Sequence, residues 1–176
     1  MARSHYLAAV EDLTTDQGHF RPTQQSWSIA EVTEHLVHAE QGGILSIWKA
    51  AVGVRMGEPV WIGHSSHEGL SIEEVIERTW RPREEVPESA VPRMGGPLGF
   101  WTVSLKSCQA LLPSLTAALE GLDLNAVIFP HPISGPLDAR QRLEFLRFHL
   151  DRHLGQVEAI RMSPVFPRGA LPRRQG

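Results

Sequence analysis

The stretch Leu146-Arg-Phe-His-Leu-Asp-Arg-His-Leu-Gly-Gln156 carries two histidines one helical turn apart, His149 and His153. Residues four positions apart project from the same face of a helix, so both imidazoles can reach one point. At about 100° per residue, most charges of this segment form a stripe on the opposite face. Arg142 is the exception, because it is a charge on the histidine side. The pattern therefore predicts a helix whose two imidazoles point into the protein.

Two buried imidazoles side by side destabilise a fold unless each has a hydrogen-bond partner or the two share a cation. A metal site and a pair of hydrogen-bonded core histidines are both consistent with this pattern. A metal site needs at least one further protein ligand. The sequence therefore has to be searched for a third group on another helix.

Such a group lies in Glu34-His-Leu-Val-His-Ala-Glu40, near the start of a second long helix. His35 shares the inward face of that helix with Ala39 and Gly42, whose small side chains leave room for a cavity. His38 lies about 60° away, on the side of Glu34, towards the rim. His35 is therefore the better ligand and His38 the better surface or supporting residue. The alternative is that His35 is a hydrogen-bonded core histidine.

Three neutral imidazoles suit Zn²⁺, Ni²⁺, Fe²⁺ or Mn²⁺ and leave coordination positions open for water or substrate. A closed structural zinc site would need four ligands, usually including cysteine. Cys108 is the only cysteine, and its apolar neighbours at helical spacing favour a buried packing role over a nucleophile. The donor set therefore indicates a catalytic type of site.

The composition is that of a single globular domain. The chain has 176 residues, 41% of them hydrophobic, a net charge of −3 and no apolar run of about 18 residues. These values argue against a membrane span and against a nucleic-acid partner. One cysteine and no apolar leader favour a cytoplasmic location. We expect one domain over residues 1–165 and a flexible tail over 166–176.

Hydrophobic periodicity and capping motifs predict an all-α fold, a four-helix bundle with a long crossover connection. A Pro/Gly-rich insertion, Gly53–Pro97, separates the second and third long helices and contains a short helix opened by Ser71. Pro113 predicts a kink or restart in the third long helix. The expected helices are Tyr6–Leu13, Ser28–Val52, Ser71–Trp80, Leu98–Leu119 and Ala139–Met162, with loops over Gly18–Gln25 and Leu122–Asp138.

Three segments in this order, Trp27–Leu36, His131–Leu137 and Phe148–Gln156, resemble the DinB-like superfamily, over roughly residues 5–162. That superfamily includes YfiT-type metal-dependent hydrolases and bacillithiol or mycothiol S-transferases. The resemblance implies a four-helix bundle with a long crossover, frequent homodimers and a divalent metal held by three histidines. Carried over to this sequence, the ligands are His35, His149 and His153.

The resemblance implies a metal-dependent enzyme that acts on a small-molecule substrate. Its reaction would be hydrolysis or transfer of a low-molecular-weight thiol. The candidate acids, bases or orienting groups are Glu34, His38, His131 and Gln156. His131 could line the pocket, bond to a backbone carbonyl or ligate directly, and Gln156 could orient a water or bond to a histidine. The alternative is a non-catalytic metal-binding or metal-free bundle that binds a protein partner.

Overall fold

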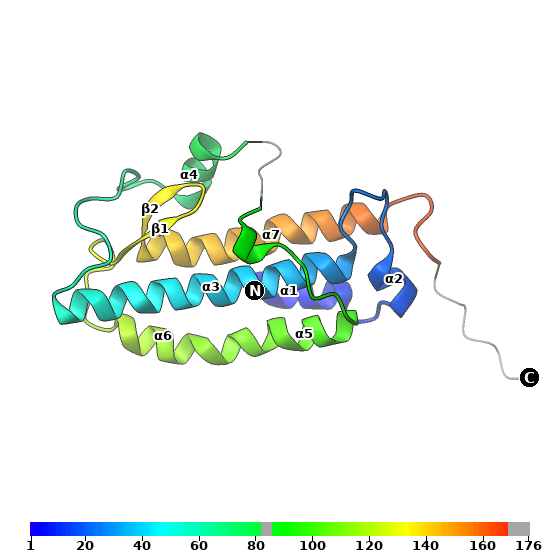
Figure 1. Ribbon diagram of the computed structural model, residues 1–176, viewed down its shortest axis with the longest axis horizontal. Coiled ribbons are helices and arrows are strands. Elements are labelled where there is room, and N and C mark those ends of the chain that lie inside the picture. Colours follow the sequence, from blue (N-terminus) through cyan, green and yellow to red (C-terminus); the bar gives the residue numbers. More distant parts are fainter. Residues whose placement is uncertain (82–85, 169–176) are drawn as a thin grey trace, which may run out of the picture.

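The computed structural model describes residues 1–81 and 86–168, and it is mostly helical with one small two-stranded sheet. The helices are α1 (Ala2–Val10), α2 (Thr15–His19), α3 (Ile29–Met56), α4 (Ile72–Thr79), α5 (Leu98–Ser107), α6 (Leu112–Leu119) and α7 (Ala139–Arg161). The strands are β1 (Ile128–His131) and β2 (Gly135–Asp138). The long helices α3 and α7 lie alongside each other, with α1 and the α5–α6 pair packed against them (Figure 1). The predicted all-α class is therefore confirmed in broad terms.

Capping motifs fix where the two long helices begin. The Ser28 hydroxyl accepts the backbone N–H of Glu31, and the Glu31 carboxylate accepts the N–H of Ser28 at 2.8 Å. Asp138 and Gln141 make the same reciprocal pair at the start of α7. Each pair satisfies two backbone donors that have no partner inside the helix. The predicted starts of both helices are confirmed.

The third long helix is divided in two. A 3₁₀ turn over Cys108–Leu111 separates α5 from α6, and Pro113 lies in the first turn of α6. Proline is tolerated there because the first N–H groups of a helix have no intrahelical acceptor. The restart expected at Pro113 is confirmed, and Cys108 is buried as predicted.

The loop predicted over Leu122–Asp138 is wrong in its second half, which forms an antiparallel hairpin. β1 pairs with β2 in a register that places Pro130 opposite Pro136 and His131 opposite Gly135. Proline argues against a central strand because it cannot donate to the ladder, but it is compatible with edge strands. Both strands of an isolated hairpin are edges. This is why the prolines do not prevent pairing here.

The described parts of the connection between α3 and α5, residues 57–81 and 86–97, lie over α3 and α7 (Figure 1). It contains α4, capped by Ser71 as predicted, which packs against α7. A short helix that the sequence interpretation missed, α2, begins at a capping box formed by Thr14 and Gln17. Phe166, in the expected flexible tail, packs edge-on against Phe20. The rest of that tail, residues 169–176, lies outside the described residues.

Candidate metal centre

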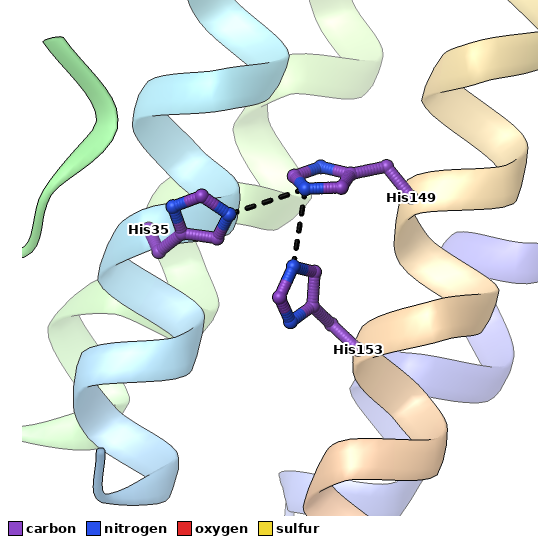
Figure 2. A group of neighbouring side chains, drawn as sticks. All are labelled: His35, His149 and His153. Atoms are coloured by element: carbon purple, nitrogen blue, oxygen red, sulfur yellow. Dashed lines mark hydrogen bonds between the residues drawn. The ribbon is translucent and has the colours of Figure 1, made fainter. Parts of the chain in front are cut away.

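Three histidines from α3 and α7 meet in the interior of the protein (Figure 2). The Nε2 atom of His149 lies 3.1 Å from the Nε2 atom of His35 and 3.1 Å from that of His153. One ligand atom from each ring lies within 4.8 Å of the other two. His35, His149 and His153 are 4%, 8% and 7% exposed, respectively, so all three are buried. The structure thus brings together the three residues singled out from the sequence.

The outer nitrogens of two of these rings are hydrogen-bonded. The Nδ1 of His35 donates to the backbone carbonyl of Ala90 at 2.7 Å, because a carbonyl oxygen can only accept. The Nδ1 of His153 donates to Oε1 of Gln156 at 2.7 Å. In a neutral imidazole only one nitrogen carries a proton. Both rings therefore direct an Nε2 lone pair towards His149.

The protons available cannot satisfy all three inner nitrogens. Burial lowers the pKa of His35, holds the pKa of His149 well below its ordinary value and lowers that of His153 to about 3. All three rings are therefore neutral near pH 7. His149 has at most one proton on Nε2, and it can donate that proton to His35 or to His153 but not to both. At least one pair of nitrogens 3.1 Å apart has lone pairs facing each other.

A divalent cation fits this arrangement of donors. Two zinc–nitrogen bonds of about 2.0–2.1 Å at a tetrahedral angle place their nitrogens roughly 3.3 Å apart. The two 3.1 Å separations are close to this value. The hydrogen bonds to Ala90 and Gln156 fix ring orientation in the way that protein groups commonly orient metal-ligating histidines. Neutral imidazoles suit Zn²⁺, Ni²⁺, Fe²⁺ or Mn²⁺.

The three imidazoles line one side of a cavity of about 310 Å³. Ala39, Gly42 and Gly43 contribute to its wall from α3, as the small residues of that helix predicted. Phe145 and Arg142 contribute from α7, and the connection between α3 and α5 contributes Val86, Pro87, Ser89 and Ala90. The volume is at the small end of the range for ligand pockets. The arrangement is thus a candidate metal site beside a space for a small molecule.

The comparison with protein-family profiles matches residues 1–157 to the DinB superfamily. The chain belongs to the DinB superfamily. Neither the curated proteins nor the solved structures that were searched contain a match. The family assignment agrees with the resemblance seen in the sequence.

In this DinB superfamily member Glu34 does not lie at the rim, where the helical wheel placed it. Its side chain is fully buried, and its carboxylate accepts the backbone N–H groups of Arg93 at 2.6 Å, Met94 at 2.7 Å and Gly95 at 3.0 Å. The connection between α3 and α5 covers this face of α3. Glu34 therefore ties that connection to the helix that carries His35.

Two other predicted acid–base candidates, His131 and His38, line the cavity and differ in their hydrogen bonds. His131 lines it, and its Nδ1 accepts the N–H groups of Ile133 and Ser134, so its proton is on Nε2. Burial, with a smaller effect from Arg142, lowers its pKa to about 3. His131 bonds to backbone amides, not to a carbonyl, and it is not in the three-histidine group. His38 lines the cavity, and its Nε2 atom lies 3.7 Å from Oε1 of Glu34.

Sequence reasoning placed Phe145 beside the histidines on the inward face of the last helix, but it did not identify Phe145 or Trp80 as part of a cavity wall. Trp80 stacks against His131 and donates its indole N–H to Ser134, and Phe145 stacks on His149. The i, i+4 spacing of Phe145 and His149 on α7 was the available signal. The signal for Trp80 was only its place in the connection between helices. Arg142 was visible as the charge on the histidine face, but the sequence assigned it no role.

Proposed function

We propose that the protein is a metal-dependent enzyme that acts on a small organic molecule. His35, His149 and His153 hold Zn²⁺, Ni²⁺, Fe²⁺ or Mn²⁺ through their Nε2 atoms. The observation that carries the proposal is the convergence of these neutral nitrogens, with too few protons to satisfy them, beside a cavity. When bound, a divalent ion supplies a Lewis acid that lowers the pKa of a water or thiol in its open positions.

The chain's own residues position the reactants. Ala90 and Gln156 hold two of the rings in place through their Nδ1 atoms. Phe145 and Trp80 provide apolar walls that limit the access of water. His38 lines the cavity, and we assign it the role of accepting the proton that the nucleophile loses.

Between the two reactions, transfer of a thiol is favoured over hydrolysis. Hydrolysis would depend on a bound ion lowering the pKa of water by many units to near neutrality, whereas a thiol has an ordinary pKa of only about 8.5 and would lose its proton outright on binding the ion. Of the four predicted acid–base candidates, Glu34 and Gln156 are already hydrogen-bonded to the protein. The Nδ1 of His131 is occupied in the same way. A site with few free bases favours a thiol over water as the nucleophile, because the thiol loses its proton more readily.

The proposal extends to the features that the family resemblance implies. These are a four-helix bundle with a long crossover, assembly as a homodimer, a cytoplasmic location and a low-molecular-weight thiol as co-substrate. Among the described helices, none combines the length and apolar character needed to cross a bilayer. Sedimentation of the purified chain tests the dimer directly.

Metal content tests the first step of the proposal. The protein is purified without an affinity tag, and its metal is measured by mass spectrometry beside that of His149→Ala and His64→Ala variants. His64 is an exposed histidine near the start of the connection between α3 and α5 and outside the three-histidine group, so it serves as the matched control. We expect close to one divalent ion per chain in the wild type and the control, and a large loss in His149→Ala. Equal metal content in all three would refute the site.

A reaction panel tests the second step. The metal-loaded protein is assayed with low-molecular-weight thiols and chlorodinitrobenzene, in which the thiol sulfur bonds to the ring carbon and chloride leaves. Ester and amide hydrolysis are measured in parallel. Thiol transfer lost in His149→Ala supports the transferase. Hydrolysis lost in that variant replaces it with the hydrolase, and metal without either activity supports the non-catalytic alternative.

A further inference from the structure

Among the described residues, Arg142 is a buried charge without a partner. Its side chain is 6% exposed, and its Nε atom has no hydrogen-bond acceptor. Within residues 1–81 and 86–168, no carboxylate forms an ion pair with it. Burial lowers its pKa only to about 10, so the guanidinium stays protonated near pH 7. A buried charge without a partner is costly to fold, and Arg142 lines the cavity beside the three histidines.

The rest of the cavity offers hydrogen-bond donors and positive charge. Arg152 lies over the ring of Trp80 at the same cavity, with its guanidinium carbon 5.3 Å from the ring centroid. His131 keeps its proton on Nε2 because two backbone N–H groups occupy Nδ1. Among the described residues that line the cavity, none is Asp or Glu. The described residues thus form a cationic, donor-rich space and place no carboxylate in its wall.

The spacing along α7 gives this space a direction. Arg142 precedes His149 by seven residues, which is two helical turns and about 10 Å along the helix axis on one face. Phe145 lies between them on that face, is 8% exposed and stacks on His149 with the rings 19° apart. One end of the cavity therefore has a guanidinium, the middle an aromatic surface and the other end the three imidazoles.

We infer that the cavity binds a small organic acid whose carboxylate pairs with Arg142 and whose apolar portion lies along Phe145. The opposite end of such a molecule would lie at the three histidines. This assignment deepens the proposed function by naming its substrate class, and it rests on that function only for the reactive end. The pairing at Arg142 does not require a metal. A planar guanidinium matches a carboxylate because it can donate two parallel N–H bonds.

Calorimetric binding of two probes of the same length tests the inference. Mercaptohexanoate and mercaptohexanol each carry a thiol for the metal end, but only the first carries a carboxylate. Both are titrated into zinc-loaded wild type, Arg142→Met, Arg142→Lys and Arg140→Met. Arg140 is exposed two residues before Arg142 on the same helix and is the matched control. Methionine retains the length of the arginine stem and removes the charge.

We expect Arg142→Met to weaken mercaptohexanoate binding by roughly tenfold or more, which is the range for a lost charge-assisted pair. Mercaptohexanol binding should change little, Arg142→Lys should retain part of the carboxylate preference, and Arg140→Met should match the wild type. Equal weakening of both probes would mean that Arg142 only shapes the cavity, and this would overturn the inference. No effect on either probe would overturn it as well.

A second arm separates this inference from the metal proposal. Hexanoate and hexanol are titrated into chelator-treated protein, and inorganic phosphate is used as a competing anion. Hexanoate binding that depends on Arg142 supports the carboxylate site even if the protein holds no metal. Phosphate binding as strong as hexanoate binding, with the same dependence on Arg142, would contradict the assignment to an apolar carboxylate. Zinc content measured on the same samples reports on the metal site alone.

Discussion

Glu34 on α3 and Arg142 on α7 are both buried charges, but in the part of the chain that the structure describes only Glu34 has partners. The Glu34 carboxylate accepts three backbone N–H groups from residues 93–95, whereas the Nε of Arg142 has no acceptor. The three histidines resemble Arg142 in this respect, because their inner nitrogens lack enough protons. Where the chain supplies every partner, a buried polar group holds the structure together. Where the described residues supply none, we propose that the missing partner is a ligand or an ion.

This contrast predicts the largest loss of stability at Glu34. Replacing Glu34 with alanine leaves three backbone N–H groups without their acceptor, at about 1–3 kcal/mol each when they stay buried. We expect the free energy of unfolding to fall by about 3–5 kcal/mol in chemical denaturation. Glu58→Ala removes an exposed carboxylate just beyond α3 and should change it by less than about 0.5 kcal/mol. A loss below about 1 kcal/mol in Glu34→Ala would show that the carboxylate does not hold the connection.

The second prediction concerns the acid sensitivity of the buried imidazoles. The pKa values of His131 and His153 are lowered to about 3 from an ordinary 6.5, and that of His149 is lowered well below it. Below pH 6.5 the unfolded chain binds protons that the folded chain does not. The contribution of these neutral histidines to the free energy of unfolding is therefore fully present above pH 6.5. It is lost as the pH falls from 6.5 towards 3, by about 1.4 kcal/mol per pH unit for each such histidine.

Denaturation of chelator-treated protein at several pH values between 7 and 4 measures this slope. In His131→Asn one of these groups is absent, so the slope should be smaller by about 1.4 kcal/mol per unit. His64→Ala, which removes an exposed imidazole, should leave it unchanged. An identical slope in the wild type and His131→Asn would contradict the assignment of a neutral, buried His131.

At Arg142 the same contrast predicts the opposite sign from Glu34. Replacing a buried charge that has no partner with an apolar side chain of similar length removes a desolvation penalty. We expect Arg142→Met to be more stable than the wild type by about 1 kcal/mol or more, with Arg140→Met unchanged. Thermal or chemical denaturation without ligand measures the difference. A clear loss of stability would show that the guanidinium has structural partners, contrary to the open cavity assigned here.

The smallest effect is expected at two neighbouring glycines of α3. A Cβ at Gly42, on the cavity side, would meet no atom within 4 Å, whereas a Cβ at Gly43 would lie 2.7 Å from Cδ2 of Leu146. Gly42→Ala should stabilise the helix by about 0.5–1 kcal/mol. Gly43→Ala must displace Leu146, so it should gain less or lose stability. Equal free energies of unfolding in the two variants would contradict the close approach of α3 and α7.

The sequence was sufficient for features set by local rules. The capping pair of Ser28 and Glu31 located the start of α3, and angular position on the two long helices selected His35, His149 and His153. Both follow from the fixed geometry of a helix, which requires no knowledge of the rest of the fold.

Features that depend on distant segments could not be predicted. Glu34 was placed near the rim because the wheel cannot show that residues about sixty positions later cover it. The hairpin was missed because proline disfavours strands in general, and only the pairing of Pro130 with Pro136 shows that both are edge residues. The lack of a partner for Arg142 among the described residues depends on every segment that forms the cavity. A local sequence pattern cannot show that a residue lacks a partner in the folded protein.

X-ray absorption of the zinc-loaded protein tests most directly whether the three converging imidazoles form a metal site. We predict three nitrogen ligands with the multiple-scattering signature of imidazole, at about 2.0–2.1 Å from one zinc per chain. In His153→Ala the imidazole count should fall or the metal should be lost on dialysis. A wild-type protein that retains no zinc after dialysis, or binds it without imidazole, would contradict the account.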